Sequence, residues 1–196
     1  MQEKAMYFLK SLIYQKIKDT GGSWNDSKLR PVVCLVESTE KSGLFWAIPV
    51  GNWNHRDDKA KERIKKFLSC PDTDLRSCYY HIGNTNEKSI FFISDVIPIT
   101  EKYVEKEYLG FNKKVYVIKN EILLQILNYK LSRILAFESS KNNYFRQHIT
   151  DIKKALIHEL ERDAIFKEIT EISEVQKEVA PVKEKVLRAR DIPKGD

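Results

Sequence analysis

The segment Ile90-Phe91-Phe92-Ile93-Ser94-Asp95-Val96-Ile97-Pro98-Ile99 is the most apolar run in the chain. β-Branched and aromatic residues dominate it, which is typical of a strand that is buried on both faces. We predict that residues 90–99 form a central strand of a sheet. Pro98 is expected at the end of this strand, because proline donates no hydrogen bond to a neighbouring strand.

Shorter apolar runs on either side of this segment predict further strands. Turn-forming Ser42-Gly43 separates the first two runs, which indicates a hairpin or a short loop connection. Gly83-Asn84 separates a third run from residues 90–99. The additional predicted strands cover residues 31–36, 44–50, 78–82 and 115–118.

Helical periodicity, with apolar residues three or four apart, appears in four other segments. Asp57 and Asp58 stand where acidic residues favour the start of a helix, and Pro71 follows its end. The predicted helices cover residues 4–18, 57–68, 121–138 and 144–166. Together with the strands they predict an α+β fold, a compact and strongly twisted antiparallel sheet flanked by helices, with a long C-terminal helical region.

The composition is that of one folded domain with a charged end. The 196 residues suit a single domain, and 42% hydrophobic residues are enough to bury a core. Beyond Lys167 the chain is rich in Glu, Lys and Val and has no aromatic residue. We expect a domain over residues 1–166, followed by a charged tail over residues 167–196 that is a solvated helix or disordered.

Charge and motif content narrow the function classes. The net charge of +6 is compatible with an anionic partner. The three cysteines have no CxxC spacing, so we expect no disulfide scaffold and no structural zinc, in a cytoplasmic protein. No apolar run is long enough to cross a bilayer, and no signal peptide is recognisable. No motif supports a zinc protease, an α/β-hydrolase, a nucleotide kinase or a dinucleotide enzyme.

The densest polar segment, residues 51–61, directly follows the predicted strand over residues 44–50. Residues 52–68 contain six Lys or Arg and three acids, a local net charge of +3. A strand that leads into the start of a helix directs backbone N–H groups toward a ready anion site. This segment is therefore the first candidate for a functional site.

Residues His55, Arg56 and Lys59 supply the groups that RNA transesterification needs without a metal. One group must accept the proton of the 2′-OH, and cations must stabilise the charged phosphorane. Histidine is the side chain whose ordinary pKa lies near neutrality. The alternative interpretation is a solvated helix face, in which His55 is a partner of Asp57.

Candidate base-stacking surfaces come from an aromatic set that consists of Trp24, Trp46, Trp53 and Tyr79-Tyr80. Trp24 and Trp53 lie in polar loops and are the better candidates, whereas Trp46 lies inside a predicted strand and is expected in the core. His81 lies in a strand-like run, where a packed side chain is the ordinary expectation.

The order of these segments resembles a known family. A basic residue precedes an apolar strand, a second strand leads into a polar, basic loop, and a third strand and a long helix follow. The segments are Lys28–Glu37, Phe45–Val50, Ile90–Ile99 and Leu124–Phe137. Over residues 5–160 the chain resembles the RNase toxins of type III toxin–antitoxin systems, the ToxN/AbiQ/CptN/TenpN group.

The resemblance implies a highly twisted β-barrel like that of the MazF/PemK and CcdB toxins. It also implies a metal-independent endoribonuclease that uses no cofactor, acts in phage defence and leaves a 2′,3′-cyclic phosphate on RNA. The implied partners are substrate RNA and an antitoxin RNA of tandem pseudoknot repeats, in a cyclic or otherwise higher-order toxin–RNA assembly. No membrane partner is expected.

Family positions carry over to this chain only in part. The basic residue ahead of the first long strand falls on Arg30, and a helix tyrosine falls on Tyr14 or Tyr7. The family shows Ser or Thr followed closely by Lys after the second strand, where this chain has Gly51-Asn52-Trp53-Asn54-His55-Arg56. The role of that Ser or Thr and Lys is then taken by Asn52, His55, Arg56 or Lys59, or the chain is a divergent branch with different chemistry.

These observations define one candidate site and two alternative functions. The catalytic candidates are Arg30, Asn52, His55, Arg56 and Lys59, with no metal ligand. The candidate RNA-binding residues are Tyr14, Lys28, Trp53, Lys61, Arg63, Lys65 and Lys66. The alternatives are a non-catalytic RNA-binding or regulatory module on the same small barrel and a protein-interaction domain that uses the charged tail.

Overall fold

The computed structural model describes residues 1–24 and 30–188, except for the side chains at 171 and 173–188. Contacts within the chain define two units, residues 1–157 and residues 158–196. The described part of the second unit continues helix α4 (Ile149–Arg188), so the predicted boundary at 166/167 falls inside this helix. Among the described residues, no helix has the length and apolar character needed to cross a membrane.

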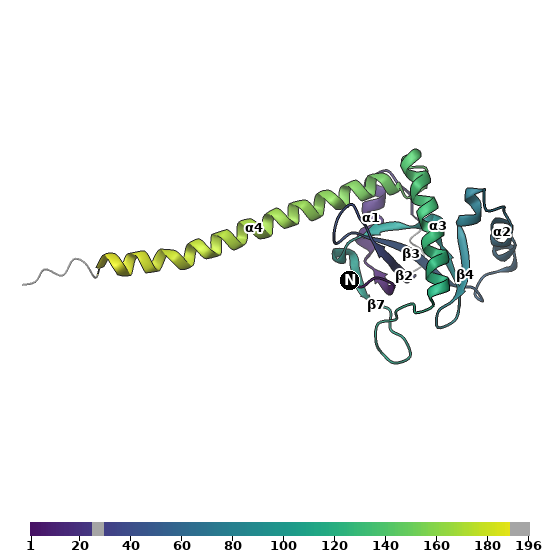
Figure 1. Cartoon of the computed structure of the whole chain (residues 1–196), viewed down its shortest axis with the longest axis horizontal. Helices are drawn as coiled ribbons and strands as arrows, with labels where there is room; N and C mark the ends of the chain where they lie inside the picture. Colours follow the sequence, from purple (N-terminus) through teal and green to yellow (C-terminus); the bar gives the residue numbers. More distant parts are fainter. Residues whose placement is uncertain (25–29, 189–196) are drawn as a thin grey trace, which may run out of the picture. The chain divides into compact units, whose positions relative to one another are not determined.

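The first unit contains an antiparallel sheet with helices packed on it, which confirms the α+β prediction (Figure 1). The strands lie in the order β4-β5-β3-β2-β1-β7, and β6 pairs with β3 beside this path. In the described residues no pairing joins β4 to β7, so the sheet is open. The strands are β1 (Ala5–Leu9), β2 (Val32–Glu37), β3 (Phe45–Asn52), β4 (Tyr80–Asn84), β5 (Lys88–Phe92), β6 (Ile97–Ile99) and β7 (Val104–Glu107).

The apolar segment 90–99 does not form one strand, contrary to the prediction. Both β5 and β6 run antiparallel to β3, but the 3-10 helix η2 (Ile93–Asp95) interrupts them. Val50 pairs with Phe91, and Ala47 pairs with Ile97. Between these two pairs β3 has two residues, whereas the segment 90–99 has five. One of those two is Pro49, which has no N–H to offer a partner strand.

Pro98 lies in the middle of β6 rather than at a strand end, opposite Trp46 of β3. The prediction was wrong because, within residues 1–24 and 30–188, β6 pairs with a strand on one side only, which is β3. A strand edge without a neighbour tolerates proline, since no hydrogen bond is lost there.

The predicted helix over residues 4–18 is wrong in its first half. Strand β1 occupies Ala5–Leu9, and helix α1 (Ser11–Asp19) follows it. β1 pairs with β2 on one side and β7 on the other, and four of its five residues are buried. Pairing on both sides of this short apolar run overrides the helical spacing of Met6, Leu9 and Ile13.

Helices α2 and α3 are close to their predicted bounds. Helix α2 (Asp58–Leu68) begins after Asp57, whose carboxylate accepts a hydrogen bond from the Ala60 N–H at 2.7 Å. Helix α3 (Glu121–Ser140) lies across one face of the sheet, where Leu127 and Leu131 join the main core (Figure 1). Two short 3-10 helices are η1 (Leu75–Cys78) and η3 (Glu101–Tyr103).

Three further elements differ from the sequence prediction: the helix at 144–166, the strand at 115–118, which does not form, and the strand at 78–82. Helix α4 begins at Ile149 and not at 144, because His148 has a φ of 53°, which lies outside the helical region. Residues 115–118 make only isolated bridges, in which Val117 pairs with Ala5 and Val115 with Leu109. Strand β4 begins at Tyr80, after η1.

Candidate functional site

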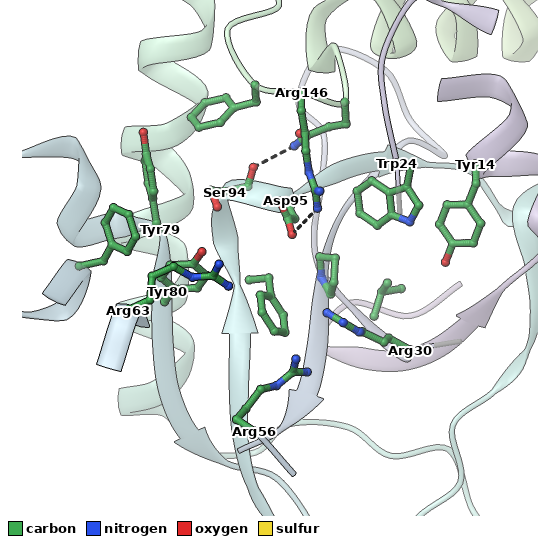
Figure 2. A pocket seen from close by; sticks show the side chains of 16 residues that line it. Tyr14, Trp24, Arg30, Arg56, Arg63, Tyr79, Tyr80, Ser94, Asp95 and Arg146 are labelled. Atoms are coloured by element: carbon green, nitrogen blue, oxygen red, sulfur yellow. Dashed lines mark hydrogen bonds and ion pairs between the residues drawn. The ribbon is translucent and has the colours of Figure 1, made fainter. Parts of the chain in front are cut away.

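A pocket of about 540 Å³ opens where η2 interrupts the strands (Figure 2). Its walls come from α1 and the segment after it, the starts of β2 and β4, β3 and the loop that leads into α2, α2 itself, the end of β5, η2, and the loop between α3 and α4. Its charged side chains are four arginines, Arg30, Arg56, Arg63 and Arg146, and one acid, Asp95. Its aromatic side chains are Tyr14, Trp24, Phe67, Tyr79, Tyr80, Phe92 and Phe145.

The interruption at η2 and the loop between α3 and α4 together build one side of this pocket. The η2 turn puts Ser94 and Asp95 at the pocket wall. Gln147 from the loop donates hydrogen bonds from Nε2 to the carbonyl oxygens of Ser94 (2.9 Å) and Val96 (2.8 Å). Two segments more than 50 residues apart in the sequence are therefore held together by one side chain.

Two arginines share the ring of Phe92. The Cζ atoms of Arg30 and Arg56 lie 5.0 and 5.2 Å from the centre of that ring. Burial and the nearby Arg56 charge lower the pKa of Arg30. The attraction of each cation to the ring offsets part of their mutual repulsion. An anionic group between the two guanidinium groups would neutralise the remaining repulsion, so this position suits a phosphate group.

Arg56 is closely packed against the strand behind it. A Cβ atom on Gly51 would lie 2.7 Å from Arg56 Nη2, so only glycine leaves room for the guanidinium group as it stands. Figure 2 shows Arg30, Arg56 and Arg63 pointing toward the middle of the pocket from different parts of the fold.

Opposite these cations, Arg146 is engaged with an acid and an aromatic ring. Its Nη2 lies 2.9 Å from Asp95 Oδ2, and its Cζ lies 5.5 Å from the centre of the Trp24 ring. Trp24 in turn stacks on Tyr14, with 5.4 Å between ring centres and 10° between planes. Burial raises the pKa of Asp95, and the charges of Arg146 and Arg30 oppose that shift.

The structure brings four of the five predicted catalytic residues together. A hollow of about 450 Å³ shares Arg30 and Arg56 with the pocket and is also lined by Asn52 and His55. His55 is exposed at this hollow. Lys59 is not part of it, because it lies further along α2 beside a separate surface hollow.

The Asn52 side chain is already engaged in the turn that follows β3. Its Nδ2 donates a hydrogen bond to the Glu87 carboxylate, and its Oδ1 accepts one from the Asn54 N–H at 2.8 Å. Asn52 therefore stabilises the loop that carries His55 and Arg56.

The remaining predicted RNA-binding residues separate into groups. Tyr14 and Arg63 line the pocket, whereas Lys61, Lys65 and Lys66 lie on α2 away from it. Lys65 forms an ion pair with Glu62 at 3.1 Å. The predicted residue Lys28 lies outside the described residues.

Trp53 does not have the predicted place in a solvated loop. It is 7% exposed and packs with Ile64, Ile90 and Phe92 in a second core cluster. The backbone N–H of Trp53 donates a hydrogen bond to the Lys88 carbonyl oxygen at 2.9 Å, which turns the segment back onto the sheet. Trp53 thus anchors the loop and offers no free face for a base. Trp46 is buried, as predicted.

Several pocket residues were not predicted from the sequence. Arg146 and Gln147 follow Tyr144-Phe145 in a segment that has no recognisable motif. Ser94 and Asp95 gave a weak signal, since two polar residues interrupt an otherwise apolar run. Tyr79 and Tyr80, by contrast, belong to the aromatic set that the sequence marks as candidate stacking residues, and both line the pocket.

Comparison with protein-family models and with curated proteins gives no match to this chain. Among the described residues, no group of three or more His, Cys, Asp or Glu side chains is positioned to hold a metal ion. What the site does is therefore argued from its chemistry. Arginines bind phosphate groups through paired hydrogen bonds, and aromatic walls accept flat bases.

Proposed function

We propose that this chain is a metal-independent endoribonuclease. The observation that supports it is the arginine-rich, aromatic pocket that joins the hollow containing His55. With four arginines and one acid, the pocket carries an excess of positive charge for phosphates. Unpaired RNA is recognised mainly by stacking of its bases on aromatic side chains and arginines, and both line this pocket.

In the proposed reaction the substrate supplies its own nucleophile. The 2′-oxygen forms a bond to phosphorus, the bond from phosphorus to the 5′-oxygen breaks, and a 2′,3′-cyclic phosphate results. His55 accepts the proton of the 2′-OH, and the leaving 5′-oxygen takes a proton from solvent. Arg30 and Arg56 stabilise the charge on the phosphorane oxygens and exchange no proton.

The biological setting belongs to the same proposal. The resemblance to type III toxins supports a toxin with a twisted, barrel-like sheet of the MazF/PemK and CcdB kind, in the cytoplasm. Its antitoxin would be an RNA of tandem pseudoknot repeats, in a cyclic or higher-order assembly. The change of partner along β3, from β6 to β5, is compatible with such a bent sheet.

A second candidate function is a non-catalytic RNA-binding or regulatory module. One observation favours it: His55 is exposed, and no hydrogen bond from the described residues orients its ring. A catalytic histidine is usually held by such a partner. The two functions differ in whether bound RNA is cut.

The experiment is a cleavage assay on single-stranded RNA in excess EDTA. Wild-type protein is compared with His55→Ala, Arg56→Ala and the control Lys114→Ala, which removes an exposed cation that does not line the pocket. We expect His55→Ala to lower the cleavage rate by roughly 10²–10⁴, as for an acid–base group. Lys114→Ala is expected to cleave like the wild type.

Three results would change the assignment. Tight RNA binding without any cleavage would favour the non-catalytic module. Cleavage that EDTA abolishes would contradict the metal-independent mechanism. Full activity in both His55→Ala and Arg56→Ala would show that the reaction occurs elsewhere on the chain.

A further inference from the structure

A series of aromatic rings leads out of the pocket, with 4.8 to 6.1 Å between the centres of successive rings. This spacing is that of rings in direct contact. The first five rings of the series line the pocket (Figure 2), and the last two lie beyond it. In order, the aromatic series consists of Phe92, Tyr80, Phe67, Tyr79, Phe145, Tyr144 and Phe137.

Tyr144 is the point at which this series reaches solvent. Its side chain is 52% exposed, whereas the other rings of the series are buried or half-buried. Phe137 and Phe145 meet it edge-on, with ring centres 4.8 and 5.2 Å away and planes at 79° and 87°. Burial and a side-chain hydrogen bond with Tyr144 raise the pKa of Tyr79 to about 12. An accessible ring is thus held in place beside a side chain of the pocket wall.

Positive charge accompanies the exposed end of the series. Lys141 is exposed, and its Nζ lies 5.8 Å from the centre of the Phe137 ring and 5.9 Å from that of Tyr144. Arg146, two residues after Tyr144, lines the pocket. Proteins bind single-stranded nucleic acid by this combination, in which bases stack on aromatic rings and nearby cations attract the backbone.

The pocket end of the series coincides with the proposed phosphate position. Phe92 is the ring that Arg30 and Arg56 share. An RNA strand that places a phosphate between these arginines and leaves the pocket past Tyr79 would next meet Tyr144. One strand can therefore use both ends of the series.

We propose that Tyr144 is a second stacking position, which takes a base of the bound RNA strand outside the pocket. The inference rests on the proposed function for its ligand class, single-stranded RNA, and adds a subsite to it. Its consequence is a length requirement. A strand that extends beyond the pocket gains affinity from Tyr144, and a dinucleotide that only fills the pocket does not.

The test compares two probe lengths in a binding measurement without cleavage. The probes are a dinucleotide and a decanucleotide of 2′-O-methyl cytidine, which have no 2′-OH to attack the phosphate. Isothermal titration calorimetry gives the affinity of each probe. We expect Tyr144→Ala to weaken decanucleotide binding roughly tenfold, a usual loss when one stacking ring is removed. Dinucleotide binding is expected to be unchanged.

Two control variants separate stacking from other effects. Tyr144→Phe keeps the ring and removes the hydroxyl group, so it should bind the decanucleotide like the wild type. Tyr129→Ala removes a matched tyrosine, which is 55% exposed and has the Arg133 Cζ atom 5.8 Å from its ring centre, but lies outside the aromatic series and the pocket. It should also bind like the wild type. Circular dichroism establishes that each variant is folded, and Tyr144→Leu, which keeps apolar bulk without a flat ring, replaces Tyr144→Ala if that variant is not.

Four results would overturn the inference. The first is unchanged decanucleotide affinity in the folded Tyr144→Ala protein. The second is an equal loss in Tyr129→Ala, and the third is an equal loss in Tyr144→Phe, which would assign the effect to the hydrogen bond with Tyr79. The fourth is a dinucleotide loss as large as the decanucleotide loss, or no binding of the decanucleotide to the wild type.

The outcome is distinguishable from that of the proposed function. A loss in Tyr144→Ala that is confined to the long probe, with no cleavage of ordinary RNA by the wild type, would support the second stacking position and contradict the endoribonuclease. Cleavage of ordinary RNA with no effect of Tyr144→Ala on decanucleotide binding would support the endoribonuclease and overturn the second stacking position.

Discussion

The proposed binding of RNA in the pocket should depend on salt in a way that follows from the charges there. Arg146 is paired with Asp95 at 2.9 Å, whereas Arg30, Arg56 and Arg63 form no ion pair within the described part of the chain. If each of these three holds one phosphate of a single strand, log K should fall against log[salt] with a slope of about −2.1. Raising the salt from about 50 to 200 mM should then weaken binding roughly 20-fold.

Removing one of these cations should reduce the slope by a calculable amount. For Arg56→Gln we expect a slope of about −1.4 and a loss of roughly sevenfold over the same salt range. Fluorescence anisotropy with a labelled 2′-O-methyl single strand measures both quantities without cleavage. Lys114→Gln removes an exposed charge that does not line the pocket and serves as the control.

Two results would refute this reasoning. An Arg56→Gln slope equal to that of the wild type would mean that Arg56 holds no phosphate. A Lys114→Gln protein with an equally reduced slope would mean that binding depends on overall charge and not on the pocket.

Three further predictions concern a strand histidine, a glycine and the tail. Burial and the nearby Lys130 charge lower the pKa of His81 to about 4, so the unfolded chain binds more protons between about pH 6.5 and 4. The free energy of unfolding should therefore fall as the pH is lowered through that range, and it should fall less steeply in His81→Gln. If denaturant titrations gave the same pH dependence of this free energy for both proteins, the prediction would be contradicted. Gly51→Ala should displace the Arg56 guanidinium group and lower RNA affinity severalfold with little change in melting temperature. Its effect should vanish in the Arg56→Gln background, and additive losses would be the contrary result. Deleting residues 172–196 should leave the melting temperature within about 2 °C, because the described core lies within residues 1–157; a large drop would show that the tail stabilises the fold.

Most elements could be predicted where a single local pattern dominates. Helix α2 has both a period of three to four and the capping residue Asp57, and β3 is an apolar run that follows the turn-forming Ser42-Gly43. Strand β1 could not be predicted, because its five apolar residues also fit a helix and only pairing with β2 and β7 decides between them. The break at η2 likewise depends on the register of β5 and β6 against β3.

The candidate site was predictable where neighbouring strands carry it. Arg30 precedes β2 and Asn52 ends β3, and the pairing of Val32 with Pro49 brings those ends together. Arg146 and Gln147 were beyond prediction, since they reach the pocket from a loop that meets η2 only in the folded chain. Trp53 was misplaced because a polar neighbourhood in the sequence does not reveal that the turn folds back.

The central claim is that the chain cuts RNA by attack of the substrate's own 2′-OH. The most direct measurement is the chemical nature of the cut ends, after incubation with single-stranded RNA in excess EDTA. A matched RNA carries 2′-deoxyribose at the cleaved nucleotide. The account predicts a 2′,3′-cyclic phosphate on the 5′ fragment and loss of cleavage at the deoxy position alone. A free 3′-hydroxyl on that fragment, or continued cleavage at the deoxy position, would contradict it.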